Sequence, residues 1–161
     1  MPDQYENPYL DSSLFIAWIK DEVIEGVDRG AIVRHILMLA ERHVFKINTS
    51  AITLAEVHKK RRSASLGQGE DEQVLAYFEH DFINIIDVDR GIGEEANRLC
   101  RQYGLMPNDA IHLACALRAE CDVLPAWDGR FTSVDHPRIR IENPQILGQL
   151  PFPESETGQQ R

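Results

Sequence analysis

Short runs of β-branched and aromatic residues alternate with longer amphipathic segments along most of this chain of 161 residues. The short runs predict strands, and apolar residues three and four positions apart predict helices with one buried face. We expect strands at residues 7–10, 43–47, 82–88, 122–126 and 138–142. Strands that alternate with helices form a parallel sheet with helices on both faces. The alternation therefore predicts one α/β domain of three layers.

We expect the first helix at residues 12–22, and several of the later helices have recognisable first or last residues. Asp28 and Asp89 stand at N-cap positions, where a carboxylate accepts a hydrogen bond from a free backbone amide. Gly104 stands at the position after a helix where glycine is preferred. The helix expected at residues 107–120 is apolar on nearly all sides in AIHLACAL, so it should lie at the centre of the domain.

The composition is that of one soluble globular domain, with 43% hydrophobic and 27% charged residues. We expect a single domain over residues 1–149 and a disordered tail over residues 150–161, which are polar and without periodicity. The N-terminus MPDQYENPYL is acidic and polar, whereas a secretory signal would be basic and then apolar. With no apolar run long enough to cross a bilayer, we expect a cytoplasmic protein without a membrane partner.

The three cysteines, Cys100, Cys115 and Cys121, form no CxxC pair. Cys100 and Cys115 fall on apolar faces of expected helices, and Cys121 precedes an expected strand. Small buried thiols that stay reduced explain this pattern better than a disulfide or a zinc site.

The net charge is −9, from 17 basic and 26 acidic residues. This balance argues against a protein that binds nucleic acid over its whole surface. It is compatible with an enzyme that holds a divalent metal with acidic side chains and confines its basic residues to one rim.

Four acidic residues lie where the expected fold brings chain segments together. Asp11 ends the first expected strand, and Asp128 follows the strand at residues 122–126. Asp109 opens the helix that leads into that strand, and Glu56 lies two turns into the third helix. In open α/β sheets, ligands bind beyond the carboxyl ends of the strands, so these four acids are candidate site residues.

Each of these acids also has a structural explanation. Asp11 and Asp109 stand where an aspartate caps a helix or complements its dipole. Asp128, in WDGR, could occupy a turn before glycine. Glu56 lies between apolar residues in ITLAEV, where a carboxylate is costly unless another group compensates it.

Carboxylates that converge on one spot repel one another and raise the pKa of their neighbours. A divalent cation removes that penalty, and oxygen ligands without histidine or cysteine favour Mg²⁺ or Mn²⁺. Such an ion activates water and stabilises charge on a phosphodiester. We therefore interpret the four acids together as a hypothetical Mg²⁺ or Mn²⁺ site.

Four segments carry a resemblance to a known family: YLDSSLFIAWI, ITLAEV, PNDAIHLACAL and DVLPAWDGRF. In order and spacing they resemble the four blocks of the PIN-domain superfamily, particularly the VapC-like ribonucleases, over almost the whole chain up to about Asn143. The resemblance implies a three-layer α/β/α fold with a central five-stranded parallel sheet. The acid and hydroxyl positions that it implies fall on Asp11, Glu56, Asp109, Asp128 and Ser13. Ala126 is a departure, because the family often has threonine or serine there, two residues before the fourth acid.

The resemblance further implies a metal-dependent endoribonuclease that uses Mg²⁺ or Mn²⁺ and cuts RNA. It implies a homodimer and the toxin of a toxin–antitoxin pair, with a small antitoxin covering the acidic cleft. The alternative is a catalytically inactive PIN-like module that binds RNA or protein, for which loss of an acid would be the sign. A phosphatase is a second alternative, but no glycine-rich phosphate loop or DxD pair follows the first expected strand.

A basic cluster ends the third helix, which opens at Thr49 or Ser50. Its members could follow the RNA backbone, or they could be a solvated helix end whose cations favour the C-terminal dipole. The cluster consists of Lys59, Lys60, Arg61 and Arg62.

Three further residues have two interpretations. His112, inside DAIHLACAL, is explained better as a histidine hydrogen-bonded within a packed helix than as a ligand or base. Trp127 and Phe131 could stack on an RNA base, although Phe131 is explained better by packing in the core.

Overall fold

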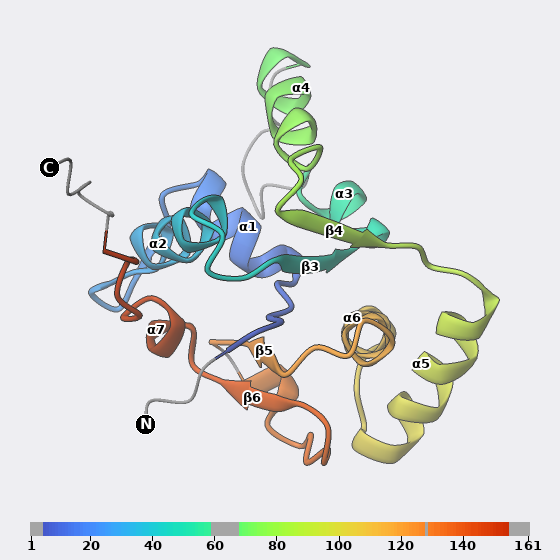
Figure 1. Cartoon of the computed structure of the whole chain (residues 1–161). Helices are drawn as coiled ribbons and strands as arrows, with labels where there is room; N and C mark the ends of the chain where they lie inside the picture. Colours follow the sequence, from blue (N-terminus) through green and yellow to red (C-terminus); the bar gives the residue numbers. More distant parts are fainter. Residues whose placement is uncertain (1–4, 59–67, 128, 155–161) are drawn as a thin grey trace, which may run out of the picture.

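The computed structural model describes residues 5–58, 68–127 and 129–154 (Figure 1). Strands β3 (Ile47–Ser50) and β4 (Ile83–Ile86) pair in parallel, and so do β5 (Val123–Pro125) and β6 (Arg140–Glu142). The segment Pro8–Tyr9 lies between the two pairs: Pro8 bridges to Val123 and Tyr9 bridges to Asn48, both in parallel. The spatial order is therefore β6, β5, Pro8–Tyr9, β3, β4.

The predicted α/β fold is confirmed, but the predicted five-stranded sheet appears as two parallel pairs joined by isolated bridges. The first predicted strand, residues 7–10, contributes only those bridges and the backbone hydrogen bonds beside them, such as Tyr9 N–H to Val123 O at 2.9 Å and Leu10 N–H to Asn48 O at 2.9 Å. These bonds fix the place where the chain leaves Leu10 and turns into the first helix.

Helices cover both sides of this arrangement (Figure 1). On one side α1 (Ser12–Ile19) packs against α2 (Arg29–Glu41), and α2 contacts the short α7 (Pro144–Leu147). On the other side α5 (Arg90–Tyr103) packs against α6 (Pro107–Arg118), which also contacts β3. Two apolar cores result, one under each helix layer. The remaining described elements are α3 (Ala51–Glu56), α4 (Gln68–Tyr77), the 3₁₀ turn Gly129–Phe131 and the β1–β2 hairpin (Val23–Ile24, Val27–Asp28).

The predicted helix boundaries are confirmed wherever a cap marks them. Asp28 accepts a hydrogen bond from Ala31 N–H at 2.9 Å, and Asp89 accepts one from Ile92 N–H at 2.9 Å. Ser50 caps α3, and Gly104 ends α5 with a φ of 68°, a conformation that favours glycine. The central position of α6 is also confirmed, because its residues from Asp109 to Leu117 are buried except Ile111, which is half-buried.

Three predicted boundaries were wrong. The strand predicted at residues 43–47 begins at Ile47, because His43 takes a φ of 59° and closes the end of α2. The helix predicted at residues 12–22 ends at Ile19, since Asp21 has a φ of 49° and the chain enters the β1–β2 hairpin. The third helix ends at Glu56, and the basic cluster Lys59–Arg62 lies outside the described residues.

The described chain continues past residue 149, where we expected the domain to end. The ring of Phe152 lies 4.4 Å from that of His35 and beneath the Arg42 guanidinium, whose Cζ is 4.2 Å away. His35 Nε2 also lies 2.8 Å from the carbonyl of Leu150. No helix in the described ranges combines the length and the apolar character that crossing a membrane requires.

Gly30→Ala is expected to destabilise the fold by about 1–3 kcal/mol. A Cβ on Gly30 would lie 2.9 Å from Asp21 Cα and 3.1 Å from Ala17 O, and neither backbone atom can move aside easily. Gly93→Ala is the matched control, because a Cβ there meets nothing within 4 Å and should stabilise α5 by about 0.5–1 kcal/mol. Urea unfolding of both variants measures the difference in the free energy of unfolding. Equal stability of the two would contradict the close approach of Gly30 in α2 to the backbone of Ala17 and Asp21.

Candidate active site

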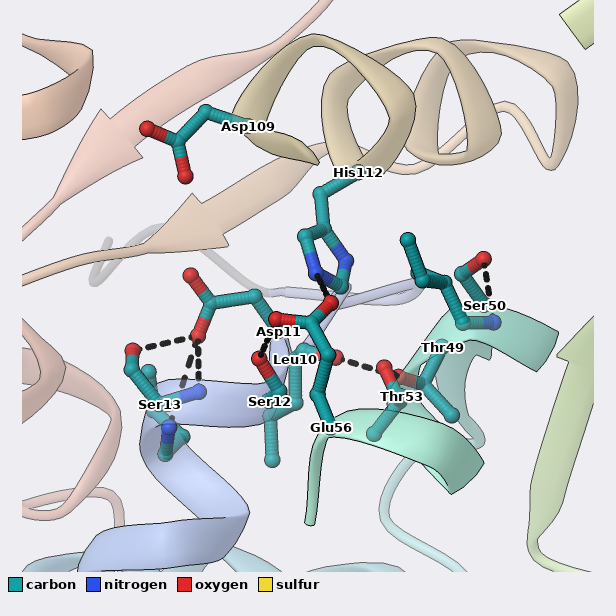
Figure 2. Close-up of polar contacts among 12 residues, drawn as sticks. Leu10, Asp11, Ser12, Ser13, Thr49, Ser50, Thr53, Glu56, Asp109 and His112 are labelled. Carbon is teal, nitrogen blue, oxygen red and sulfur yellow. Dashed lines mark hydrogen bonds and ion pairs between the residues drawn. The ribbon is translucent and has the colours of Figure 1, made fainter. Parts of the chain in front are cut away.

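Asp11 stands at the point where the chain leaves the bridged segment and enters α1. Its carboxylate is 1% exposed and caps the helix, accepting hydrogen bonds from Ser13 N–H at 3.0 Å and Leu14 N–H at 3.4 Å. The Ser13 hydroxyl donates a third bond to the same oxygen, Oδ1, at 2.5 Å. The other oxygen, Oδ2, makes none of these three bonds and points the opposite way (Figure 2).

Arg130 joins Asp11 to Asp109 across the domain. One guanidinium nitrogen lies 3.4 Å from Asp11 Oδ2, and the other lies 3.4 Å from Asp109 Oδ1. Asp109 is 7% exposed and belongs to the first turn of α6, where its charge also complements the helix dipole. Two buried carboxylates from distant parts of the sequence thus converge on one cation.

Glu56, the last residue of α3, is held at both carboxylate oxygens. Ser12 Oγ donates to Oε2 at 3.0 Å, and His112 Nε2 lies 3.0 Å from Oε1 (Figure 2). Burial raises the pKa of Glu56, but the hydrogen bond and charge of His112, the Ser12 hydroxyl and the charge of Arg130 outweigh it. The net effect is a lowered pKa, so Glu56 stays ionised at neutral pH.

His112 connects Glu56 to a buried tyrosine. The ring of His112 is 2% exposed, and its Nδ1 lies 2.7 Å from the hydroxyl of Tyr9, which is fully buried. An ionised carboxylate can only accept, so Nε2 donates to Glu56, while Nδ1 and the Tyr9 hydroxyl share a second hydrogen bond. Burial raises the pKa of Tyr9 well above its ordinary value, with an added effect from the negative charge of Asp11, so its hydroxyl stays protonated at neutral pH.

A cleft of about 540 Å³ opens beside these groups. Part of its wall is polar and belongs to the residues just described: Ser12, Ser13, Glu56 and Arg130. The rest contains apolar side chains together with Glu22, Arg29 and Trp127. The cleft therefore gives a ligand access to the Glu56 carboxylate and to the guanidinium that joins the two aspartates.

The donor chemistry of this site fits a divalent cation. Asp11 and Asp109 are nearly buried, and the Arg130 guanidinium between them supplies positive charge to both carboxylates. In the part of the chain that the structure describes, however, no three acidic, histidine or cysteine side chains are grouped closely enough to hold one metal ion. Asp128 lies outside the described residues.

Some site residues were not predicted from the sequence. Arg130 was not predicted as a site residue, although it stands in the WDGRF segment two residues after the candidate acid Asp128. Tyr9 was counted only as part of a strand, and His112 only as a packed histidine. The prediction that Phe131 packs in the core is confirmed, since it is fully buried.

The sequence matches the model of the PIN domain family over residues 9–137. No curated protein matches it. Three similar solved structures are a toxin–antitoxin complex from Klebsiella pneumoniae, the sarcin–ricin loop-cleaving toxin VapC20 from Mycobacterium tuberculosis, and VapBC2 from Rickettsia felis bound to a DNA fragment from its promoter. Their TM-scores are 0.60, 0.61 and 0.56, with 20%, 17% and 20% identity. The alignments cover 85%, 83% and 85% of this chain and 97%, 98% and 98% of theirs. At these identities the likeness concerns the fold alone.

Proposed function

Because the chain belongs to the PIN domain family, a family of nucleases, we propose that it is an endoribonuclease that hydrolyses RNA with the help of Mg²⁺ or Mn²⁺. The observation that carries this proposal is the convergence of Asp11 and Asp109 on one positive charge beside an open cleft. We propose Asp11, Glu56 and Asp109 as metal ligands and Asp128 as a fourth. A divalent cation at these carboxylates would activate a water molecule and offset negative charge on the phosphodiester.

The residues around the acids hold them in fixed orientations. The Ser13 hydroxyl and two backbone amides hold Oδ1 of Asp11, so the other oxygen, Oδ2, keeps one direction. Ser12 and His112 fix both oxygens of Glu56, which lines the cleft and can orient an attacking water molecule. Arg130 is the cation placed to contact a phosphate of the RNA, since it lines the same cleft.

The biological setting that we propose is that of a toxin inhibited by a cognate antitoxin. Support comes from the fold alone, which this chain shares with two toxin–antitoxin assemblies and a toxin that cleaves the sarcin–ricin loop. A homodimer, a cytoplasmic location, and RNA contacts by Lys59, Lys60, Arg61 and Arg62 belong to the same proposal.

The test is incubation of purified protein with labelled RNA and Mg²⁺, Mn²⁺ or EDTA. Cleavage that needs a divalent ion supports the proposal. The alternative, an inactive PIN-like module that binds RNA or protein, predicts binding without cleavage under all three conditions.

Tyr9→Phe is expected to lower cleavage about tenfold while leaving the protein folded. Removal of the hydroxyl deprives His112 Nδ1 of its partner, so the ring no longer holds Glu56 in one orientation. Loss of a group that orients a metal ligand typically costs 10- to 100-fold in activity or metal affinity, because the ligand no longer keeps one orientation. Tyr103→Phe is the control, because its hydroxyl bonds to Asp135 O at the surface. Cleavage rates and apparent Mn²⁺ affinity are measured for both; equal activity of the two variants would show that the Tyr9–His112 chain is only structural.

A further inference from the structure

Part of the cleft wall has no task in the proposed chemistry. It is formed by the apolar side chains of Ile16, Ile24 and Ile52 and by the polar groups of Arg29 and Trp127. Arg29 is the first residue of α2, and Trp127 follows β5. The Arg29 guanidinium lies over the indole ring, with Cζ 4.8 Å from the ring centroid. An indole ring with a guanidinium over it thus forms part of the wall of the cleft that Glu56 and Arg130 also line.

Two hydrogen-bond donors in this wall have no acceptor among residues 5–58, 68–127 and 129–154. The indole nitrogen of Trp127 and Nε of Arg29 are buried, and neither finds a partner among the residues that the structure describes. A buried N–H group without an acceptor is costly, and a ligand that supplies one regains the lost free energy. Beside them, Glu22 lines the cleft and pairs with Arg29 at 3.4 Å, so a carboxylate acceptor is also present.

We propose that this part of the cleft, Arg29, Trp127 and Glu22, is the binding site for one nucleobase of the RNA. The inference rests on the proposed function and names the group that the same cleft recognises next to the phosphate. Guanidinium and indole planes offer stacking to a base, and single-stranded RNA is recognised by such stacking together with hydrogen bonds to base edges. Two N–H donors and one carboxylate match the mixed acceptors and amino groups of a base edge.

The dimensions and surroundings favour a nucleotide over a protein segment. A volume of about 540 Å³ falls in the range of small-ligand pockets. A protein helix would need a longer row of apolar anchors, whereas this wall also contains the charged pair Glu22–Arg29. Arg130 lines the same cleft, so a single nucleotide can place its phosphate there and its base against Trp127. Arg29 Nε and the indole nitrogen of Trp127 are both buried in the unliganded protein. Binding of a base therefore requires the partly exposed Arg29 side chain to shift over the indole ring.

The test follows the indole N–H of Trp127 by ¹H–¹⁵N NMR of the full chain. The sample contains EDTA. Each of the four nucleoside 5′-monophosphates, or ribose 5-phosphate, is then added separately. Trp18 is the only other tryptophan and serves as the internal reference, with Trp18→Phe to assign the two signals. We expect at least one nucleotide to move the Trp127 proton downfield, as a new acceptor would, while ribose 5-phosphate and the Trp18 signal show no change.

Arg29→Lys should weaken that nucleotide about three- to tenfold, the loss expected for one hydrogen bond, because lysine keeps the charge toward Glu22 but lacks Nε–H and the planar group. Arg34→Lys is the matched control, since Arg34 lies on the same helix and pairs with Asp21 at the surface. An unchanged Trp127 signal with every nucleotide, a change with ribose 5-phosphate alone, or a change only on addition of a protein partner would overturn the base site. Because no cleavage is needed, the result is independent of whether the protein proves to be a nuclease.

Discussion

Asp11→Asn is expected to reduce RNA cleavage at least about 100-fold and to abolish the stabilisation that Mn²⁺ gives to the wild type. Stabilisation of transition-state charge by a bound metal is worth several kcal/mol, and Asp11 offers Oδ2, the oxygen that pairs with Arg130 and takes no part in capping α1. A ligand that binds only the folded protein raises its melting temperature by mass action, so the variant should lose that shift. The measurement pairs thermal melts, with and without Mn²⁺, with an RNA cleavage assay.

The matched control for this variant is Asp28→Asn. Asp28 also caps a helix, accepting from Ala31 N–H, but it is exposed and does not line the cleft. Asparagine caps helices about as well as aspartate, so a purely structural aspartate tolerates the change. Asp28→Asn should therefore keep both activity and the Mn²⁺ shift. If Asp11→Asn behaved like Asp28→Asn, Asp11 would be a helix cap and nothing more.

The structure changes one expectation about the metal-free variant. Bare repulsion among the acids would make Asp11→Asn at least as stable as the wild type without metal. Arg130 already offsets that repulsion by pairing with both Asp11 and Asp109. In Asp11→Asn, the amide NH₂ group would face the Arg130 guanidinium, and both groups are donors. We therefore expect the free energy of unfolding of the metal-free variant to fall by about 1–3 kcal/mol.

Arg130→Ala is expected to raise the affinity for Mn²⁺ about tenfold while lowering the stability of the metal-free protein. The guanidinium occupies the position where a cation would meet Asp11 and Asp109, so it competes with the metal. Hydrogen bonds between charged groups are worth about 1.5–3 kcal/mol, and the 3.4 Å separations and partial exposure of Arg130 place this pair at the low end. One such bond, at about 1.4 kcal/mol, corresponds to the tenfold change.

The affinity of Arg130→Ala is measured by Mn²⁺ titration without RNA, which separates competition for the acids from any contact with phosphate. Arg118→Ala is the control, since Arg118 pairs with the capping carboxylate of Asp89 at the surface. An unchanged or weaker Mn²⁺ affinity for Arg130→Ala would mean that the metal binds without displacing the arginine.

Local signals in the sequence predicted the parts of the fold that local chemistry determines. Asp28, Ser50 and Asp89 each cap the helix that their side-chain chemistry predicts, and Gly104 has the positive φ that its position requires. The apolar character of α6 correctly indicated a central helix. Asp11 and Asp109 were selected by their places at a strand end and a helix start, and Glu56 by its place in an apolar helical stretch. In the structure, Arg130 joins Asp11 to Asp109, and Glu56 lines the cleft that Arg130 also lines.

Long-range contacts could not be predicted in the same way. Strand β3 is buried throughout yet contains Asn48, Thr49 and Ser50, so a search for apolar runs placed the strand too early. Its polar side chains are satisfied by distant partners, such as Thr49 Oγ1 donating to Leu10 O at 2.6 Å. Arg130 was missed for the same reason, because its role follows from two carboxylates that are 119 and 21 residues away in sequence.

The most direct test of the central claim is one cleavage experiment on wild-type protein stripped of metal with EDTA. A labelled RNA is added first without divalent ions, and excess Mn²⁺ is then supplied to the same sample. We predict intact RNA in the first phase and cleavage in the second, with Asp11→Asn inactive in both. Cleavage in EDTA, or the same rate of cleavage by Asp11→Asn after Mn²⁺ is added, would contradict the assignment of these acids as a metal-dependent nuclease site.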